Sequence, residues 1–138
     1  VIHLTGKGKS GAPARAGYFS APFAYDELPH FYACAALALS RAGAGTISEL
    51  AANAISAILV PLRGLAQDHQ EANARTAEKS GGVMVLEQSA LEKDFVPLVK
   101  KLLSDPQHLQ KMSTMIQSLH HPHAAESIAT VLQAAVHR

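Results

Sequence analysis

A glycine-rich junction at residues 36–53, ALALSRAGAGTISELAAN, has the residue types that hold an anion. Gly43 and Gly45 permit a tight turn and let a ligand come close to the backbone, and Thr46 is predicted to begin a helix. A helix N-terminus presents unpaired N–H groups and the positive end of the helix dipole, so a diphosphate is the expected ligand. Glu49, one turn into the helix, could accept hydrogen bonds from two ribose hydroxyls, as acidic residues do in other nucleotide-binding α/β folds.

The same residues also have a purely structural interpretation. Thr46 and Glu49 are spaced as a capping box, in which each side chain satisfies a backbone N–H at the start of the helix. The glycines would then be ordinary turn residues. The motif alone leaves both interpretations open.

Polar side chains crowd a second junction, after the apolar run AILVPL at 57–62. They are Gln67, Asp68, His69, Gln70, Glu71 and Asn73. Asp68 is explained as a helix N-cap, and the others could be solvated surface. Two polar junctions at one edge of a sheet nevertheless favour a ligand site.

Elements that place both junctions at one edge follow from the hydropathy pattern. Apolar runs predict strands at 1–4, 17–23, 35–40, 57–62 and 82–87. Helical patterns lie at 26–34, 46–54, 68–80, 92–104, 106–119 and 123–136. Uniformly apolar strands separated by helices predict a parallel sheet with helices on both faces. We therefore expect one doubly wound, Rossmann-like α/β domain over 1–138, with ligands beyond the carboxyl ends of its strands.

Composition excludes several classes of protein. A formal net charge of +1 argues against a nucleic-acid-binding surface. Cys34 is the single cysteine, so an internal disulfide is excluded. No apolar run approaches the roughly 18 residues of a membrane span. The chain opens inside an apparent strand and without methionine, so we expect a segment upstream.

Two further motifs are weaker. The segment TGKGKSG at 5–11 resembles a P-loop, but the first glycine of that motif would fall on His3. The segment HHPH at 120–123 is better explained as a proline-broken connection between helices than as a metal site, because structural zinc usually needs four well-spaced ligands. We expect neither an ATP site nor a metal or cofactor.

The segments SRAGAGTISELAA, AILVPL, QDHQEANA and IHLTGKG together resemble the C-terminal domain of the MurG family, and the resemblance extends to HPHAAESIATVL near the end of the chain. These are N-acetylglucosaminyltransferases of the GT-B fold that add the second sugar of the peptidoglycan lipid precursor. The resemblance implies two doubly wound domains facing across a cleft. The C-terminal domain, to which this chain corresponds, would bind UDP-N-acetylglucosamine.

The resemblance also implies roles for particular residues. The diphosphate and ribose would be lined by Ala44, Gly45, Thr46, Ile47, Ser48 and Glu49. Gln70, with His69 beside it, would reach the sugar hydroxyls. Phe23 and Ala24 would flank the uracil, with Tyr25 as an alternative to Ala24, and Leu28 would cover it. Lys7 could lend charge to the diphosphate or the acceptor, although most lysines are solvated surface residues.

What the chain lacks relative to the family limits its expected activity. The catalytic base is expected on an N-terminal domain, and a first strand with a Gly-Gly-Ser loop is also expected upstream. Ser56 and Arg63 stand where the family often has other residues, and either could alter the loop that carries Gln70. We therefore expect weak donor binding and no sugar transfer by this chain alone.

The resemblance implies a lipid-linked muramoyl-pentapeptide acceptor, bound through the missing domain, and a peripheral location at the cytoplasmic face of the bacterial inner membrane. The family works in cell wall biogenesis, and hence in cell shape and division. The alternative is a non-catalytic nucleotide-sugar-binding or assembly subunit that acts with a separate partner chain.

Overall fold

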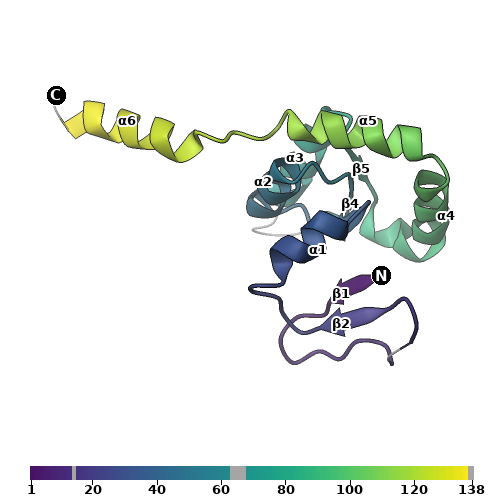
Figure 1. Ribbon diagram of the computed structural model, residues 1–138. Coiled ribbons are helices and arrows are strands. Elements are labelled where there is room, and N and C mark those ends of the chain that lie inside the picture. The colour runs from purple at the N-terminus through teal and green to yellow at the C-terminus, as the bar shows by residue number, and fades with distance from the viewer. Residues whose placement is uncertain (14, 63–67, 137–138) are drawn as a thin grey trace. The chain divides into compact units, whose positions relative to one another are not determined.

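The computed structural model describes residues 1–13, 15–62 and 68–136. The backbone forms two compact units, Val1–Ala35 and Ala36–Arg138. Each is described by itself, and Figure 1 shows the order of the elements along the chain. Within the described ranges, no helix is both long enough and apolar enough to cross a membrane.

The first unit contains two parallel strands and one helix. Strand β1 (Ile2–Leu4) pairs with β2 (Phe19–Ala21), so that His3 lies opposite Ser20. Helix α1 spans Leu28–Cys34, and the ring of Phe31 on this helix lies 5.7 Å from the ring of Phe19 on β2. This aromatic contact packs the helix against the strand pair.

The second unit is built on a three-stranded parallel sheet. Its strands β3 (Ala38–Ser40), β4 (Ala57–Leu59) and β5 (Val83–Val85) lie in that order. In the register, Leu39 lies opposite Ile58, which lies opposite Met84. All three residues of β4 are buried, as expected for a central strand covered on both faces.

Helices follow the strands in the alternation that the sequence predicts. They are α2 (Ala44–Ala52), α3 (Asp68–Glu78), the short 3-10 helix η2 (Gln88–Ala90), α4 (Leu91–Leu103), α5 (Pro106–Gln117) and α6 (Ala124–Val136). Helix α3 contacts β5, α2 contacts both α3 and α5, and α4 contacts α5. The predicted α/β fold with parallel strands and covering helices is confirmed.

The core of the second unit lies between the sheet and the pair α4 and α5. Ile58, Val60 and Leu86 supply the sheet side of this buried cluster, and Leu102 and Met112 supply the helix side. Burial of such side chains stabilises the fold by about 1.5–3 kcal/mol each. The cluster holds the carboxyl ends of β4 and β5 in place, since Val60 and Leu86 directly follow those strands.

Two positions explain how α5 is fixed against the turn after α2. The buried hydroxyl of Ser56 donates a hydrogen bond to the carbonyl of Leu109 at 3.0 Å, and the hydroxyl of Ser113 donates to the carbonyl of Ala54 at 2.6 Å. Ala54 has a φ of 52°, a left-handed conformation more usual for glycine. Ser56 thus has a structural role in this chain, whereas Arg63 lies outside the described residues.

The strand pairing differs from the sequence predictions in two details. The parallel strands form two sheets, β1–β2 and β3–β4–β5, where one sheet was expected. Each ladder of paired residues is three residues long. The hydrogen bond from Val60 N–H to the carbonyl of Ser40 lies at the end of the pairing between β3 and β4. The apolar runs extend further than the ladders because buried residues such as Val60 and Pro61 continue beyond them.

Candidate functional site

Arg41 links the carboxyl ends of the three strands in the second unit. It directly follows β3, and its Nη1 donates to the carbonyl of Val60, after β4, at 3.1 Å and to Oε1 of Gln88, after β5, at 2.6 Å. One guanidinium therefore connects three neighbouring strand ends. It also places a permanent positive charge at the edge where parallel sheets bind ligands.

Helix α2 begins two residues earlier than the sequence predicted. Its N-cap is Gly43, which is extended and makes no side-chain capping bond. Thr46 is the third residue of the helix, so the predicted helix start at Thr46 and the capping box based on it are wrong. The cause is backbone geometry: Gly43 itself turns into the helix, and its carbonyl accepts the first intrahelical hydrogen bond, from Ile47 N–H, at 3.0 Å.

This start leaves a set of donors at the sheet edge. The N–H groups of Ala44, Gly45 and Thr46 have no intrahelical acceptor, as in the first turn of any α-helix. The helix carries no acidic side chain in that turn. Its positive dipole end therefore has neither a side-chain cap nor a carboxylate in the first turn to offset it.

The predicted residues of α2 divide between two faces of the helix. Ala44, Ile47 and Ser48 line a shallow groove together with residues of α3, and the hydroxyl of Ser48 donates to the carbonyl of Ala44 at 3.1 Å. Gly45 and Glu49, four residues apart, share another face. The groups at the helix start are therefore backbone N–H groups, and the carboxylate of Glu49 lies one turn further along the helix.

The start of α3 is tied to the same edge by two amide side chains. Oε1 of Gln70 accepts a hydrogen bond from Leu62 N–H at 3.2 Å, and Nδ2 of Asn73 donates to the carbonyl of Ala42 at 3.3 Å. With its oxygen bound to Leu62, Gln70 presents its Nε2 group, which is purely a donor. His69 is exposed, and Gln67 lies outside the described residues.

A cluster of carboxylates around a second arginine, Arg75, was not predicted from the sequence. Arg75 donates to Glu71 at 2.8 Å, to Glu78 at 3.0 Å and to Glu87 at 2.7 Å. The hydrogen bonds to Glu78 and Glu71 raise the pKa of the Arg75 guanidinium above its ordinary value. The spacing of Glu71 and Glu78 from Arg75 is readable as helical ion pairs, but the bond to Glu87 requires that α3 lie beside β5.

The residues predicted to meet a uracil all lie in the first unit. Ala24 is buried, whereas Tyr25 is 74% exposed and its ring lies 4.4 Å from that of Phe23. The N–H of Tyr25 donates to Oε2 of Glu27 at 3.2 Å. Leu28 begins α1. The two aromatic rings therefore form the accessible apolar surface of this segment, and Ala24 could contribute mainly backbone groups.

The lysine-rich segment after β1 forms a turn. Gly6 and Gly8 have φ values of 90° and 74°, and Lys9 N–H donates to the carbonyl of Gly6 at 3.2 Å. The hydroxyl of Thr5 donates to the carbonyl of Lys9 at 3.0 Å. Within residues 5–13, no helix follows this turn, so it lacks the helix start that a P-loop needs.

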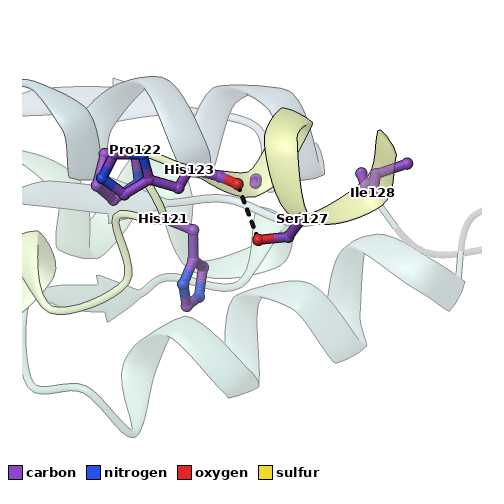
Figure 2. A pocket seen from close by; sticks show the side chains of 6 residues that line it. His121, Pro122, His123, Ser127 and Ile128 are labelled. Carbon is purple, nitrogen blue, oxygen red and sulfur yellow. Dashed lines mark hydrogen bonds between the residues drawn. The ribbon is translucent and has the colours of Figure 1, made fainter. Parts of the chain in front are cut away.

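The histidine segment connects α5 and α6. Figure 2 shows His121 and His123 beside a pocket that Ser127 and Ile128 also line. Nδ1 of His123 lies 2.9 Å from Oε2 of Glu126, and the hydroxyl of Ser127 donates to the carbonyl of His123 at 2.9 Å. Among the residues that the structure describes, no three His, Cys, Asp or Glu side chains are grouped to hold a metal.

Comparisons with known proteins show the family of this chain. The model of the glycosyltransferase family 28 C-terminal domain matches residues 1–128. A UDP-N-acetylglucosamine--N-acetylmuramyl-(pentapeptide) pyrophosphoryl-undecaprenol N-acetylglucosamine transferase from Alkalilimnicola ehrlichii is 42% identical over 138 residues, covering 95% of this chain and 38% of the relative. The protein of the same name from Trichormus variabilis is 35% identical over 141 residues, covering 100% of this chain and 39% of the relative.

A solved structure is also similar. The crystal structure of Acinetobacter baumannii MurG superposes with a TM-score of 0.76 at 28% sequence identity, covering 89% of this chain and 36% of that chain. The present chain thus spans less than half the length of the proteins it matches. From the family match and these relatives, we conclude that the chain belongs to the glycosyltransferase family 28 C-terminal domains.

Proposed function

We propose that this chain binds UDP-N-acetylglucosamine and forms the donor half of an inverting N-acetylglucosaminyltransferase that converts lipid I to lipid II in peptidoglycan synthesis. The observation that carries the proposal is the start of α2 beside Arg41, in a chain of this family. There the first turn of α2 has neither a side-chain cap nor an acidic residue, and it follows closely in the chain after Arg41, whose guanidinium is held at the carboxyl edge of a parallel sheet. This combination suits a diphosphate.

The remaining parts of the donor have matching groups. Glu49 shares a helix face with Gly45 and is proposed to accept hydrogen bonds from the ribose hydroxyls. Gln70, held by Leu62, offers donors to the hydroxyl oxygens of the sugar. In the first unit, Phe23 and Ala24 are proposed to flank the uracil and Leu28 to cover it, with Tyr25 as the alternative to Ala24 because exposed aromatic rings stack on bases.

In the chemical step, the group that most needs stabilisation is the departing UDP, on which negative charge develops as the sugar leaves. The first-turn N–H groups of α2 and the charge of Arg41 would supply this stabilisation. The base that deprotonates the acceptor hydroxyl is proposed to come from an N-terminal domain. The relatives are named for an undecaprenol-linked acceptor, so we propose that the whole protein works at the cytoplasmic face of the bacterial inner membrane.

Calorimetric titration of this chain with UDP-N-acetylglucosamine tests the donor site, with UDP-glucose as the competing ligand. A Glu49→Gln variant removes the charge that the ribose would meet, and Glu92→Gln, on the exposed first turn of α4, is the matched control. We expect selective binding that is weakened about tenfold by Glu49→Gln, the cost of roughly one hydrogen bond to a charged group. Equal effects of the two substitutions would contradict the proposed site.

A transfer assay with a lipid-linked acceptor tests the second part of the proposal. We expect no sugar transfer by the isolated chain, because the base lies outside it. A measurable rate of sugar transfer would show that the chain contains its own base. It would contradict the proposal that the base comes from an N-terminal domain.

A further inference from the structure

Arg75 holds three carboxylates from two different parts of the second unit. Glu71 and Glu78 lie one turn before and one turn after it on α3, and Glu87 follows β5. All three nitrogens of the guanidinium group donate, at distances of 2.7–3.0 Å. Such a fork of charge-assisted hydrogen bonds fixes direction as well as distance.

The cluster is anchored to the sheet through the backbone. The second carboxylate oxygen of Glu78 accepts a hydrogen bond from Val85 N–H, the last residue of β5, at 3.2 Å. Through Glu78, Arg75 links α3 to the end of β5. Through its direct hydrogen bond to Glu87, Arg75 also links α3 to the residues that follow β5. An isolated ion pair on a helix surface would contribute little to stability. This network instead connects α3 to β5 and to the residues that follow it.

The two ends of the network lie next to residues of the candidate site. Glu71 directly follows Gln70, whose side chain is bound to Leu62 after β4. Glu87 directly precedes Gln88, which accepts the hydrogen bond from Arg41. Arg75 thus connects the first turn of α3 to the segment that Arg41 holds against the ends of β3 and β4.

We propose that Arg75 is a positioning residue for recognition of the donor sugar: it holds the first turn of α3 so that Gln70 meets the sugar hydroxyls. This inference rests on the proposed function. The diphosphate would be bound by the start of α2 and by Arg41. Arg75 donates to neither in the described hydrogen bonds, and Arg41 keeps its bond to the carbonyl of Val60 whatever Arg75 does. Loss of the directed hydrogen bonds of Arg75 should therefore weaken binding of the sugar part of the ligand more than binding of the nucleotide part.

Arg75→Lys is the informative substitution. It keeps the positive charge among the carboxylates, so the fold is spared their mutual repulsion, but a lysine ammonium cannot reproduce the three directed bonds of the fork. Arg15→Lys is the matched control, since Arg15 lies in the first unit, over the ring of Tyr18. Thermal unfolding of each variant confirms that it is folded before binding is measured.

Calorimetric titrations of the chain with UDP and with UDP-N-acetylglucosamine give the test. For Arg75→Lys we expect about a tenfold loss of affinity for UDP-N-acetylglucosamine and less than about a twofold change for UDP, the size expected when one hydrogen bond is misplaced. Arg15→Lys should change neither. Equal losses for both ligands, or no loss for either, would overturn the positioning role.

A double-variant cycle separates positioning through Gln70 from a general effect on the fold. If Arg75 acts through Gln70, then Arg75→Lys should cost little further affinity once Gln70→Ala has removed the side chain. Additive losses would contradict the inference. If the unsubstituted chain binds neither UDP nor UDP-N-acetylglucosamine, the proposed function itself fails, and this result is visible before any variant is compared.

Discussion

Replacing Gly45 by alanine should strengthen the fold and weaken the ligand site at the same time. Gly45 is the second residue of α2, and a Cβ built there has no heavy atom within 4 Å. Glycine is the poorest helix former after proline, by about 1 kcal/mol relative to alanine in a helix interior. Since nothing opposes the added methyl group, Gly45→Ala should stabilise the folded chain by about 0.5–1 kcal/mol.

The same methyl group should obstruct a diphosphate. It would stand beside the N–H groups that the first turn of α2 presents to an anion, where glycine lets an oxygen approach the backbone. We expect the affinity for UDP to fall about tenfold or more, which corresponds to about 1.4 kcal/mol. The thermal midpoint should rise by about 2–4 °C over the same substitution.

The assay pairs thermal unfolding with calorimetric titration of UDP. Ala52→Gly, at the exposed last residue of α2, is the matched control because it reverses the propensity change at the opposite end of the helix. It should lower stability and leave UDP binding unchanged. The double variant Gly45→Ala/Ala52→Gly should return close to the original stability and still bind UDP poorly.

One result would refute this reasoning. If Gly45→Ala raises the midpoint and binds UDP as well as the original chain, the first turn of α2 does not hold the diphosphate. A lowered thermal midpoint would instead mean that atoms of the protein itself oppose the methyl group added at Gly45.

Three further substitutions test the site and the fold. Gln70→Glu keeps an acceptor for Leu62 N–H but removes the Nε2 donor, so UDP-N-acetylglucosamine binding should weaken about tenfold in calorimetry while UDP binding stays within about twofold. Ala54→Gly should raise stability by about 0.5–1 kcal/mol in urea unfolding, because glycine adopts the left-handed φ of 52° without strain; a loss would show that the turn is not strained. Gly82→Ala should destabilise by about 1–3 kcal/mol, since the new Cβ would collide with the backbone of Ile116; unchanged urea unfolding would contradict the close packing of α5 on the start of β5.

The order and type of the elements could be predicted from the sequence because each strand is a compact apolar run and each long helix has its own periodicity. The start of α2 was the exception. Thr46 and Glu49 have the spacing of a capping box, and the sequence alone cannot show that Gly43, three residues earlier, already adopts the N-cap conformation. Local signals compete at such positions, and the backbone geometry decides between them.

The candidate site was only partly predictable for a different reason. The junctions around Gly45 and Gln70 could be predicted from residue type, since glycines and polar side chains lie directly after apolar strands. The roles of Arg41 and Arg75 depend on partners 47 and 12 residues away in the sequence. No periodicity encodes such contacts, because they exist only once the strand ends are side by side.

The start of α2 differs from the starts of α4, α5 and α6 in a way that fold stability does not explain. Helix α4 has Glu92 in its first turn, α5 has Asp105 as a side-chain cap that accepts from the N–H of its first turn, and α6 has Glu126. Each carboxylate offsets the positive helix end. Helix α2 has instead a glycine cap at Gly43 and a second glycine at Gly45. Because glycine at position 45 costs helix stability and no first-turn carboxylate offsets the dipole of α2, this start at the carboxyl edge of the sheet favours an anionic ligand.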